Sequence, residues 1–550
     1  MDLRVVARGW LVLILAASAG CLGPREQFLP SGNPALETFL RPKIRQRDGR
    51  TLMAVGGGML LAAPGLGDFY ARHQDRLVWS TTSGPRPAAR QFMGLLKQAP
   101  DEGLPAPAYH LQAIEAALGG WQRGGGNRRG LVRLADLDLL LTSAFLRYTD
   151  QLQGGRVAPE SREWQGGAYT DPGRLLDSAL VVDQLLPVLG RLRPTHPEYL
   201  RLCQALKAYR QLEAGGGWQA LPAGSRPRKG QRGPAEASLR QRLIAGRDLD
   251  STAADLGFDD QVEGALRRFK RRHGLSATGR ADDPTLEALD VPVARRISQL
   301  AANLERWRWL PRGQEARYLL VRLDAFALDL VEAGQVALSM KVIAGKSQWR
   351  TPIFTSTLSQ VVLNPYWNVP AGIAREEVLP ALSNDPAYLE ERGFVVVSGV
   401  GDQARVVAAD SVDWSSAGSE DWPYTFMQAP GPENPLGRMK FLLPNEFNIY
   451  LHDTSNRELF SRETRDFSHG CIRLEKSLEL AVELLQGNPG WSRTHLREVL
   501  QTGETKQVAL ALPIPVYFSY WTAWVDEEGL VGFRPDLYGG DAKMAAVLDQ

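Results

Sequence analysis

The spacing of hydrophobic residues changes along the chain near residue 318. From about residue 35 to 240, hydrophobic positions recur with helical spacing, as in residues 137–148, and glycine-rich breaks separate the helical stretches. Beyond Tyr318 the period becomes two, as in the alternation of Val336, Leu338, Met340 and Val342 with Ala337, Ser339 and Lys341. The pattern predicts a multidomain α+β protein, mainly helical in its first part and mainly β in its second.

A small helical unit is expected between these two parts, at about residues 241–292. Four residues fall at the spacing of one helix face: Val262, Ala265, Leu266 and Phe269. Asp260 is the expected N-cap of this helix, and Asp283, followed by Pro284, is the expected N-cap of a second helix. The pattern predicts a compact unit built around these two helices.

Residues 447–485 combine a strand pattern with a helix pattern. Apolar and polar residues alternate in the first segment: Phe447, Asn448, Ile449, Tyr450, Leu451 and His452. This alternation predicts a half-buried strand on which His452 shares a face with Asn448 and Tyr450. Apolar residues then recur at helical spacing from Leu474 to Leu485. Cys471 is therefore expected just before a helix N-terminus, where free backbone N–H groups and the helix dipole favour an anion.

Composition and charge narrow the classes of function. The chain has 550 residues, enough for about two to four domains. Its 64 basic and 62 acidic residues give a formal net charge of +2, which provides no electrostatic support for nucleic-acid binding. A glycine-rich stretch at residues 124–130 lacks the Gly-Lys-Ser/Thr ending of a nucleotide-binding loop, so we interpret it as a flexible loop.

The N-terminus has the composition of an export signal. Arg4 and Arg8 precede an apolar run that is too short to span a bilayer core, which needs about 20 apolar residues. We expect residues 1–21 to act as a signal peptide and the mature protein to be exported to the periplasm. Two processing outcomes stay open: cleavage after Ala17-Ser18-Ala19, or acylation of Cys21, which would anchor the protein to the membrane as a lipoprotein.

Cys471 and His452 are the candidate nucleophile and base. A neutral thiol, with a free pKa of about 8.5, is a weak nucleophile, so a catalytic cysteine needs an imidazole or a helix N-terminus beside it. A lone cysteine is more often a small buried hydrophobic residue than a nucleophile. The catalytic interpretation of Cys471 and His452 therefore depends on the longer string of residues in which they occur.

That string runs from His452 through a spacer to Ser468-His469-Gly470-Cys471 and Arg473. It resembles the active-site signature of the L,D-transpeptidase family with a YkuD-type catalytic domain. Three further segments resemble the large periplasmic, YcbB-like branch of this family: Asn364 to Pro370, Asn434 to Phe441, and Tyr520 to Val525. The unit at 241–292 is similar to the peptidoglycan-binding domain 1 family, on hydrophobic positions that support its fold better than its binding. A helical spacer is the alternative interpretation of that unit.

The resemblance implies an order of domains. Residues 35–240 would form a mainly helical scaffold, residues 241–292 the peptidoglycan-binding-like unit, and residues 317–500 the mainly β catalytic domain. Residues 371–433 would be inserted in the catalytic domain as a lid, and residues 501–550 would pack on the scaffold or on the catalytic domain. A cover over a cysteine site would exclude water and favour an amine as the acceptor.

The residues by themselves support acyl transfer through a thioester, in which Cys471 attacks a carbonyl and His452 accepts its proton. The resemblance names the substrates, which are two stem peptides of peptidoglycan. It implies that the carbonyl at the third position of a tetrapeptide stem is transferred to the side-chain amine of a neighbouring stem. Terminal D-alanine would be released and a 3-3 cross-link formed, in cell wall biogenesis and the control of cell shape. Carbapenems are expected to acylate the same cysteine.

Other residues of the string have supporting interpretations. Backbone N–H groups around Gly470 and Cys471 would stabilise an oxyanion, while His469 and Ser468 would hold the loop. Arg473 would pair with a carboxylate of the donor stem, or else steady the loop through a salt bridge. Tyr450 would shape the pocket, or else simply pack.

Two other functions stay open: a cysteine L,D-carboxypeptidase that passes the acyl group to water, and a non-catalytic peptidoglycan-binding scaffold protein. The spacing of His452, Asp453, His469 and Cys471 lacks the regularity of a zinc site, so no metal or other cofactor is expected. The expected partners are peptidoglycan stem peptides, with glycan contact through residues 241–292 as one interpretation. The sequence does not identify partner synthases.

Overall fold

The computed structural model describes residues 40–548 apart from residues 48, 82, 160–168, 182–184, 251–256, 312–314, 400–403 and 420. The predicted signal peptide and Cys21 lie outside these described residues. The chain divides into two compact units. The first unit contains residues up to 97, 106–148 and 171–189, and the second unit contains residues 98–105, 149–170 and everything from residue 190 onward.

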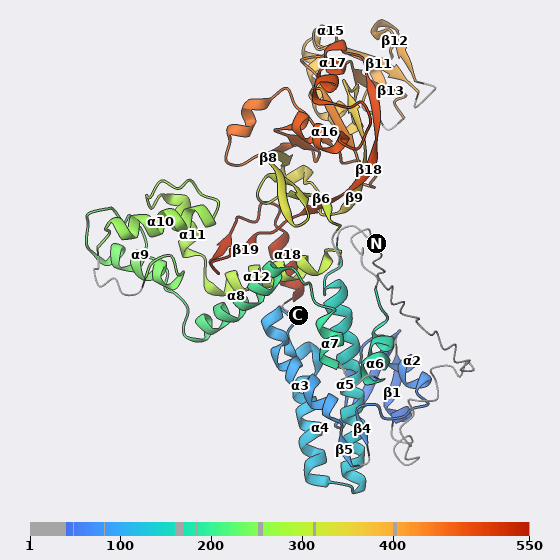
Figure 1. The fold of residues 1–550 in the computed structure, drawn as a ribbon, viewed down its shortest axis with the longest axis vertical. Coiled ribbons are helices and arrows are strands. Elements are labelled where there is room, and N and C mark those ends of the chain that lie inside the picture. Colours follow the sequence, from blue (N-terminus) through green and yellow to red (C-terminus); the bar gives the residue numbers. More distant parts are fainter. Residues whose placement is uncertain are drawn as a thin grey trace, which may run out of the picture. The chain divides into compact units, whose positions relative to one another are not determined.

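Helices form most of the first unit (Figure 1). They are α2 (Leu66–Arg72), α3 (Pro87–Gln98), α4 (Leu111–Gly124), α5 (Arg128–Gly154), α6 (Pro172–Val181) and α7 (Leu185–Gly190), with short 3-10 turns η1 (Arg41–Lys43) and η3 (Ala106–Tyr109). An antiparallel sheet contains β1 (Ile44–Arg47), β2 (Arg50–Val55) and β3 (Gly58–Leu61), and a hairpin joins β4 (Ser80–Thr81) to β5 (Gly84–Pro85). The core is aromatic, with Trp79, Phe92, Phe145 and Tyr148 fully buried.

A buried carboxylate anchors this aromatic core. Asp138 of α5 accepts hydrogen bonds from the backbone N–H groups of Val78 at 3.0 Å and Trp79 at 2.8 Å, and from the Tyr70 hydroxyl at 2.8 Å. Burial raises the pKa of Asp138 to about 6. Because a buried polar group is costly unless it is hydrogen-bonded, these bonds fix the segment around Trp79 against α5.

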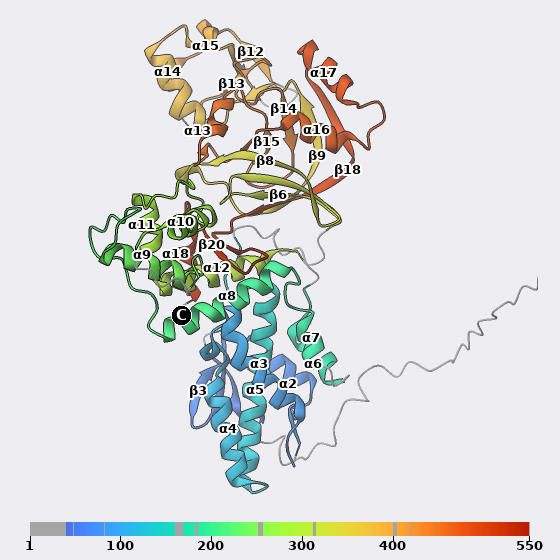
Figure 2. The same cartoon turned by 60° about the vertical axis from the view of Figure 1, so that its left-hand side comes forward.

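The second unit begins with helical elements: η2 (Ala99–Glu102), α8 (Pro197–Ala214), α9 (Pro234–Ala245), α10 (Asp260–Arg272), α11 (Asp283–Asp290) and α12 (Val293–Trp309). Helices α9, α10 and α11 enclose a hydrophobic cluster of their own. Asp259 and Asp282 cap α10 and α11 by accepting from the N–H groups of Val262 and Thr285. Each cap lies one residue before the aspartate predicted from the sequence, because the side chain reaches the N–H three residues on. Helix α8 lies alongside α12 in both views (Figures 1 and 2).

A nine-stranded sheet forms the centre of the second unit. Its strand order is β16-β8-β17-β15-β14-β9-β18-β6-β7, and an additional pairing of β7 with β8 closes it into a barrel-like sheet. The strands are β6 (Arg317–Arg322), β7 (Ala327–Glu332), β8 (Gln335–Gly345), β9 (Thr355–Leu363), β14 (Met439–Leu442), β15 (Leu451–His452), β16 (Asp466–Ser468), β17 (Ile472–Leu474) and β18 (Lys506–Ser519). The long strand β8 pairs with three strands: its first part pairs with β7, and its last part pairs with β17 on one side and with β16 on the other.

The predicted fold class is confirmed: helical regions precede a β-rich region in an α+β multidomain chain. Helices α16 (Ser477–Leu485) and α17 (Arg493–Thr502) connect β17 to β18, and short turns η5 (Ser347–Trp349) and η10 (Arg457–Ser461) lie in loops. Because β18 pairs with both β9 and β6, the sheet extends past the predicted domain boundary at residue 500. Among the described residues, no helix combines the length and hydrophobicity needed to cross a membrane.

Residues 367–428 form a separate small sheet with the strand order β10-β13-β11-β12. Its strands are β10 (Trp367–Asn368), β11 (Phe394–Ser398), β12 (Arg405–Val407) and β13 (Tyr424–Gln428). Its helical elements are α13 (Ala371–Ile373), the π-helical turn η6 (Ala374–Val378), α14 (Leu379–Asn384), α15 (Tyr388–Glu391), η8 (Ala409–Ser411) and η9 (Trp414–Ser416). A core that includes Val378, Val396 and Phe426 packs inside this subdomain. The insertion predicted at residues 371–433 falls in this region.

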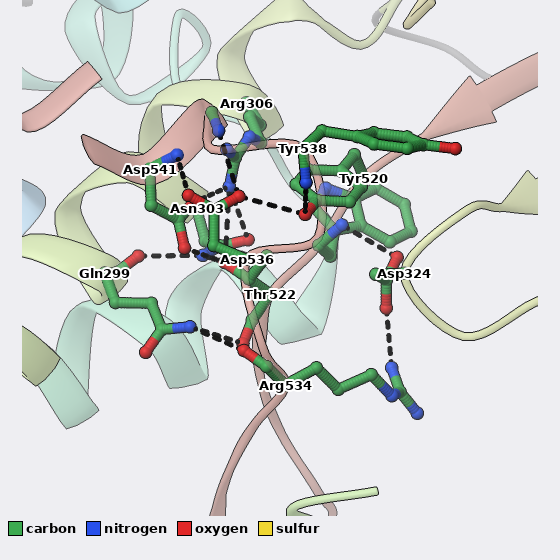
Figure 3. A network of polar contacts seen from close by, with 12 residues as sticks. Gln299, Asn303, Arg306, Asp324, Tyr520, Thr522, Arg534, Asp536, Tyr538 and Asp541 are labelled. Atoms are coloured by element: carbon green, nitrogen blue, oxygen red, sulfur yellow. Dashed lines mark hydrogen bonds and ion pairs between the residues drawn. The ribbon is translucent and has the colours of Figure 1, made fainter. Parts of the chain in front are cut away.

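The chain after β18 runs back to α12 through β19 (Ala523–Val525), β20 (Val531–Phe533) and α18 (Gly540–Leu548). The rings of Trp307 and Trp521 stack with their centroids 4.5 Å apart. Figure 3 shows the polar network that accompanies this packing. In it, the Arg306 guanidinium pairs with Asp541 at 2.6 Å, and the Thr522 hydroxyl donates to the other oxygen of Asp541 at 2.7 Å.

Candidate active site

Three neighbouring strands of the barrel-like sheet place polar residues on one face. Lys440 of β14 lies opposite His452 of β15, which in turn lies opposite Arg473 of β17. Directly paired residues point to the same face of a sheet, and so do residues two positions apart. Tyr450 and Cys471 therefore share this face with the other three residues. The fold brings the predicted nucleophile and the predicted base onto one surface, although 18 residues lie between them in the sequence.

Two local predictions for this region are wrong. Strand β17 follows Cys471 directly, and helix α16 begins only at Ser477, so no helix N-terminus lies beside the thiol. The reason is that Ile472 and Leu474 pair with β15 and β8 and bury their side chains in the core. The strand predicted at 447–452 is limited to Leu451–His452, because Asn448 adopts a left-handed conformation with φ +56°.

His452 is buried and neutral. Its Nδ1 lies 2.6 Å from the backbone oxygen of Asp453. A carbonyl oxygen only accepts hydrogen bonds, so Nδ1 carries the proton and Nε2 keeps its lone pair. Burial, with a contribution from the positive charge of Arg473, lowers the pKa of His452 to about 3. At neutral pH the ring is therefore an imidazole with a free basic nitrogen.

Cys471 lies in an environment that disfavours the resting thiolate. Burial raises the pKa of its thiol above the ordinary value. Hydrogen bonds from the backbone and hydroxyl of Tyr450, and the positive charges of Lys440 and Arg473, act in the opposite direction but do not overcome burial. Sγ lies 3.9 Å from the backbone oxygen of Asn448. The arrangement keeps a neutral thiol that becomes a nucleophile only when a base removes its proton.

The loop that carries Cys471 is fixed by two hydroxyl groups. Ser468 Oγ donates to the Cys471 carbonyl at 2.6 Å and accepts from the Gly470 N–H at 3.1 Å. Thr351 Oγ1 donates to the Gly470 carbonyl at 2.7 Å and accepts from the Gly345 N–H at 3.0 Å. Because the Gly470 N–H is used by Ser468, the N–H of Cys471 is the remaining predicted oxyanion donor in this loop.

His469 faces away from the sheet, toward the inserted subdomain. Its Nε2 lies 2.8 Å from Glu377 Oε1, and its ring packs on Trp349 with the centroids 3.8 Å apart. Both residues come from outside the Ser468–Arg473 string: Glu377 belongs to η6 and Trp349 to η5. This contact joins the inserted subdomain to the nucleophile loop.

A cavity of about 770 Å³ opens in front of this loop. Its walls include Trp349 and Arg350, Ile373 and Glu376 of the inserted subdomain, and His469 and Gly470 of the loop. The inserted subdomain therefore supplies part of the surface that a substrate would contact. A cavity of this size lies within the usual range for small-molecule and peptide sites, about 300–1,000 Å³.

Two cations in the site differ in how well the sequence indicates them. Arg473 was a candidate; its guanidinium has no ion-pair or hydrogen-bond partner among the described residues. Lys440 was not a candidate, although its Nζ lies 3.8 Å from the centre of the Tyr450 ring and its charge acts on Cys471. The signal for Lys440 is a charged residue between the apolar Met439 and Phe441, both of which are buried in β14.

Asp453 is a second residue that sequence reasoning missed. Its carboxylate accepts from the N–H of Arg438 at 3.0 Å and from the Ser477 hydroxyl at 2.9 Å. These bonds fix the segment whose carbonyl oxygen orients His452. Gly437 makes this possible, because a Cβ atom at that position would clash with Asp453. The Asn434 to Phe441 segment therefore helps to orient His452 through its contacts with Asp453.

Comparison with known protein families identifies three regions of the chain. Residues 64–206 match a family described as the Scaffold domain, and residues 316–491 match the L,D-transpeptidase catalytic domain, YkuD. Residues 233–289 match a family described as "Putative peptidoglycan binding domain". Cys471, His452, Lys440 and Arg473 all lie within the second of these matches.

Individual relatives were found as well. A curated protein of Haemophilus influenzae described as "Putative L,D-transpeptidase" is 37% identical over 257 residues, which is 46% of this chain and 51% of the relative. The chain therefore spans about half the length of this relative. A solved L,D-transpeptidase from Mycobacterium smegmatis is 13% identical, with a TM-score of 0.18, covering 38% of this chain and 60% of that one. A solved L,D-transpeptidase in complex with imipenem is 11% identical, with a TM-score of 0.17 and the same coverage. TM-scores this low show no similarity of fold beyond what the family matches already show.

Proposed function

We propose, from the premise that residues 316–491 form an L,D-transpeptidase catalytic domain of a peptidoglycan cross-linking family, that this protein forms 3-3 cross-links through a thioester on Cys471. The observation that carries the proposal is the common face of β14, β15 and β17. On that face a thiol, a neutral imidazole with a free Nε2 and two cations lie together. Gly470, the residue before the thiol, lines the adjoining cavity.

In the first half-reaction, His452 Nε2 accepts the thiol proton as Sγ attacks the donor carbonyl. The imidazole is a suitable base because it is uncharged, and because its Nδ1–H is held by the Asp453 carbonyl. The proton then passes from His452 to the departing amine of D-alanine, and the C–N bond breaks to leave the thioester. The Cys471 N–H is the proposed donor to the tetrahedral oxyanion.

In the second half-reaction, the side-chain amine of an acceptor stem attacks the thioester. His452 takes a proton from this amine, a new amide bond forms, and Cys471 Sγ leaves and regains a proton. Arg473, whose guanidinium has no partner among the described residues, is the proposed contact for the donor carboxylate. Tyr450 holds the sulfur through hydrogen bonds, which supports a role in positioning rather than simple packing.

The inserted subdomain is the proposed lid of this site. It contributes Ile373 and Glu376 to the cavity wall, and Glu377 reaches His469 of the nucleophile loop. Such a cover would exclude water from the thioester and so favour an amine acceptor over hydrolysis. We also propose that residues 233–289 contact peptidoglycan and that the mature protein is periplasmic, since the substrate lies there.

The competing function is an L,D-carboxypeptidase, which would use the same thioester with water. Incubation of the purified protein with a disaccharide tetrapeptide and an isotope-labelled tripeptide acceptor separates the two by mass spectrometry. A labelled dimer with loss of D-alanine, absent in Cys471→Ala, supports the transpeptidase. Tripeptide carrying solvent oxygen, without any dimer at high acceptor concentration, would make the protein a carboxypeptidase instead.

A further inference from the structure

The first unit contains a cavity that the proposed reaction does not use. It has a volume of about 690 Å³ and lies where the β2–β3 turn, the end of α4 and the start of α5 meet. Helices α4 and α5 lie side by side in both views, joined by the short glycine-rich turn that follows Gly124 (Figures 1 and 2). All residues that line the cavity belong to the first unit.

Basic side chains dominate its lining. The cations are Lys43, Arg123, Arg128, Arg129 and Arg133, and the single acid is Asp136. Five positive charges and one negative charge leave a net charge of +4. The whole chain has a net charge of only +2, so positive charge is concentrated at this cavity.

Asp136 organises the floor of the cavity. It is only 1% exposed, and its carboxylate pairs with Lys43 Nζ at 2.6 Å and with Arg133 at 3.0 Å. The Gly56 N–H of the β2–β3 turn lies 3.4 Å from the same carboxylate. A buried carboxylate with partners from three segments fixes those segments relative to one another. It also neutralises one cation and leaves the others in excess.

The three remaining guanidiniums are free to bind a ligand. Arg123, Arg128 and Arg129 have no ion-pair or hydrogen-bond partner among the described residues. Three arginines at one cavity repel one another unless an anion compensates them. Their spacing on a helix end and on the next helix start lets them approach one ligand from different sides.

The turn between α4 and α5, which separates Arg123 from Arg128 and Arg129, is held closely against α5. Asn127 Oδ1 accepts from the Gly130 N–H at 2.9 Å, which caps the helix. Gly130 packs directly on the Gly125 carbonyl, so any Cβ at that position would overlap the turn. The stretch interpreted from the sequence as a flexible loop is therefore a fixed turn followed by the first residues of α5, Arg128 to Gly130.

We propose that this cavity is a binding site for a compact phosphate-bearing anion, such as a diphosphate. Each phosphate carries about −1.5 to −2 charges near neutral pH, so a diphosphate matches three unpaired guanidiniums better than a single carboxylate does. Planar guanidiniums also bind phosphate oxygens in pairs. The ligand is either a free diphosphate or the phosphate head of a lipid, because both present the same chemistry.

The test uses the full-length purified protein and calorimetric titration with inorganic diphosphate. Arg128→Gln/Arg129→Gln removes two exposed cations from the cavity, and Arg271→Gln/Arg295→Gln removes two exposed arginines of the second unit as the charge-matched control. We expect the cavity variant to bind diphosphate at least about tenfold more weakly than wild type. The control variant is expected to bind as wild type does.

Vesicles of phosphatidylcholine with and without phosphatidic acid identify the source of the phosphate. Binding that needs phosphatidic acid and is lost only in the cavity variant supports the site and assigns a lipid head. Diphosphate binding without vesicle binding supports the site and assigns a free anion. No heat with diphosphate in the wild type, or equal loss in the cavity and control variants, overturns the proposal.

Discussion

Burial controls the protonation state of both His452 and Cys471. It lowers the pKa of the imidazole to about 3 and raises that of the thiol, so the two groups do not form an imidazolium–thiolate pair at rest. The Asp453 carbonyl selects the tautomer, and Tyr450 and Lys440 act on the sulfur. In the resting site both the thiol and the imidazole are therefore uncharged, and the thiol loses its proton only when it attacks an electrophile.

This assignment predicts the pH dependence of alkylation at Cys471. A raised thiol pKa means less thiolate than in a free cysteine at neutral pH, so the rate with iodoacetamide should increase with pH beyond neutrality. No step near pH 6.5 is expected, because His452 stays neutral down to about pH 3. Peptide mass mapping separates Cys471 from Cys203, whose pKa burial raises to about 12. A reactive plateau below pH 6 would show the ion pair and contradict the assignment.

The free guanidinium of Arg473 predicts a defect in donor binding. Arg473→Lys keeps the positive charge beside Cys471 but loses the planar fork. We expect KM for the tetrapeptide donor to increase about fivefold or more, with the iodoacetamide rate at Cys471 nearly unchanged. If Arg473 instead steadies the loop, the melting temperature and the alkylation rate should fall while KM stays the same.

Several elements hold the loop between β16 and β17. Thr351, which follows η5, binds the carbonyl of Gly470, and Ser468 of β16 closes the loop on itself. The C-terminal segment adds Tyr538, whose hydroxyl donates to the Gly345 carbonyl at the end of β8 at 2.7 Å. Since Gly345 also donates to Thr351, the nucleophile loop is connected by hydrogen bonds to elements far away in sequence.

Thr351 provides the test of this support. Thr351→Val keeps the shape but leaves the buried Gly345 N–H without its partner, at a cost of about 1–3 kcal/mol. We expect a lower melting temperature and a turnover reduced by about tenfold, since a displaced reacting group lowers the rate strongly. Thr351→Ser retains the hydroxyl and should keep most of both. Equal turnover in the valine and serine variants would show that the Thr351 hydroxyl does not position the nucleophile loop.

Within the second unit, the C-terminal segment joins the barrel-like sheet to α12. Gln299 of α12 donates to the carbonyls of Thr522 and Arg534, and Arg534 pairs with Asp324 after β6 at 2.6 Å. Buried Arg306 and partly buried Asp541 form the ion pair at the centre of this network (Figure 3). The catalytic region therefore depends on residues beyond its last strand.

Breaking this ion pair should destabilise the second unit. Arg306→Met leaves the largely desolvated Asp541 carboxylate without its cation and should lower the free energy of unfolding by about 3 kcal/mol. Adding Asp541→Asn removes the uncompensated charge, so the double variant should regain more than half of that loss. Denaturant unfolding followed by tryptophan fluorescence measures both values. A double variant no more stable than the single one would show that the charge itself contributes little.

The sequence indicates the fold class because hydrophobic periodicity reports which faces are buried. It indicates Cys471 and His452 because the residue string between them is specific. The prediction from the sequence is wrong directly after Cys471, because a short apolar run there fits either a strand or the start of a helix. Pairing with β15 and β8 makes this segment a strand. Lys440, Asp453 and Thr351 escape sequence reasoning because their roles arise from strand register and from bonds between distant segments.

The central claim is that Cys471 forms a thioester with a peptidoglycan stem. The most direct measurement is the intact mass of the purified protein during incubation with a disaccharide tetrapeptide, followed by mapping of the modified peptide. The account predicts an adduct equal to the substrate minus D-alanine, located on Cys471, sensitive to hydroxylamine and absent in Cys471→Ala. No adduct on a folded wild-type protein, or an adduct that persists in Cys471→Ala, would contradict it.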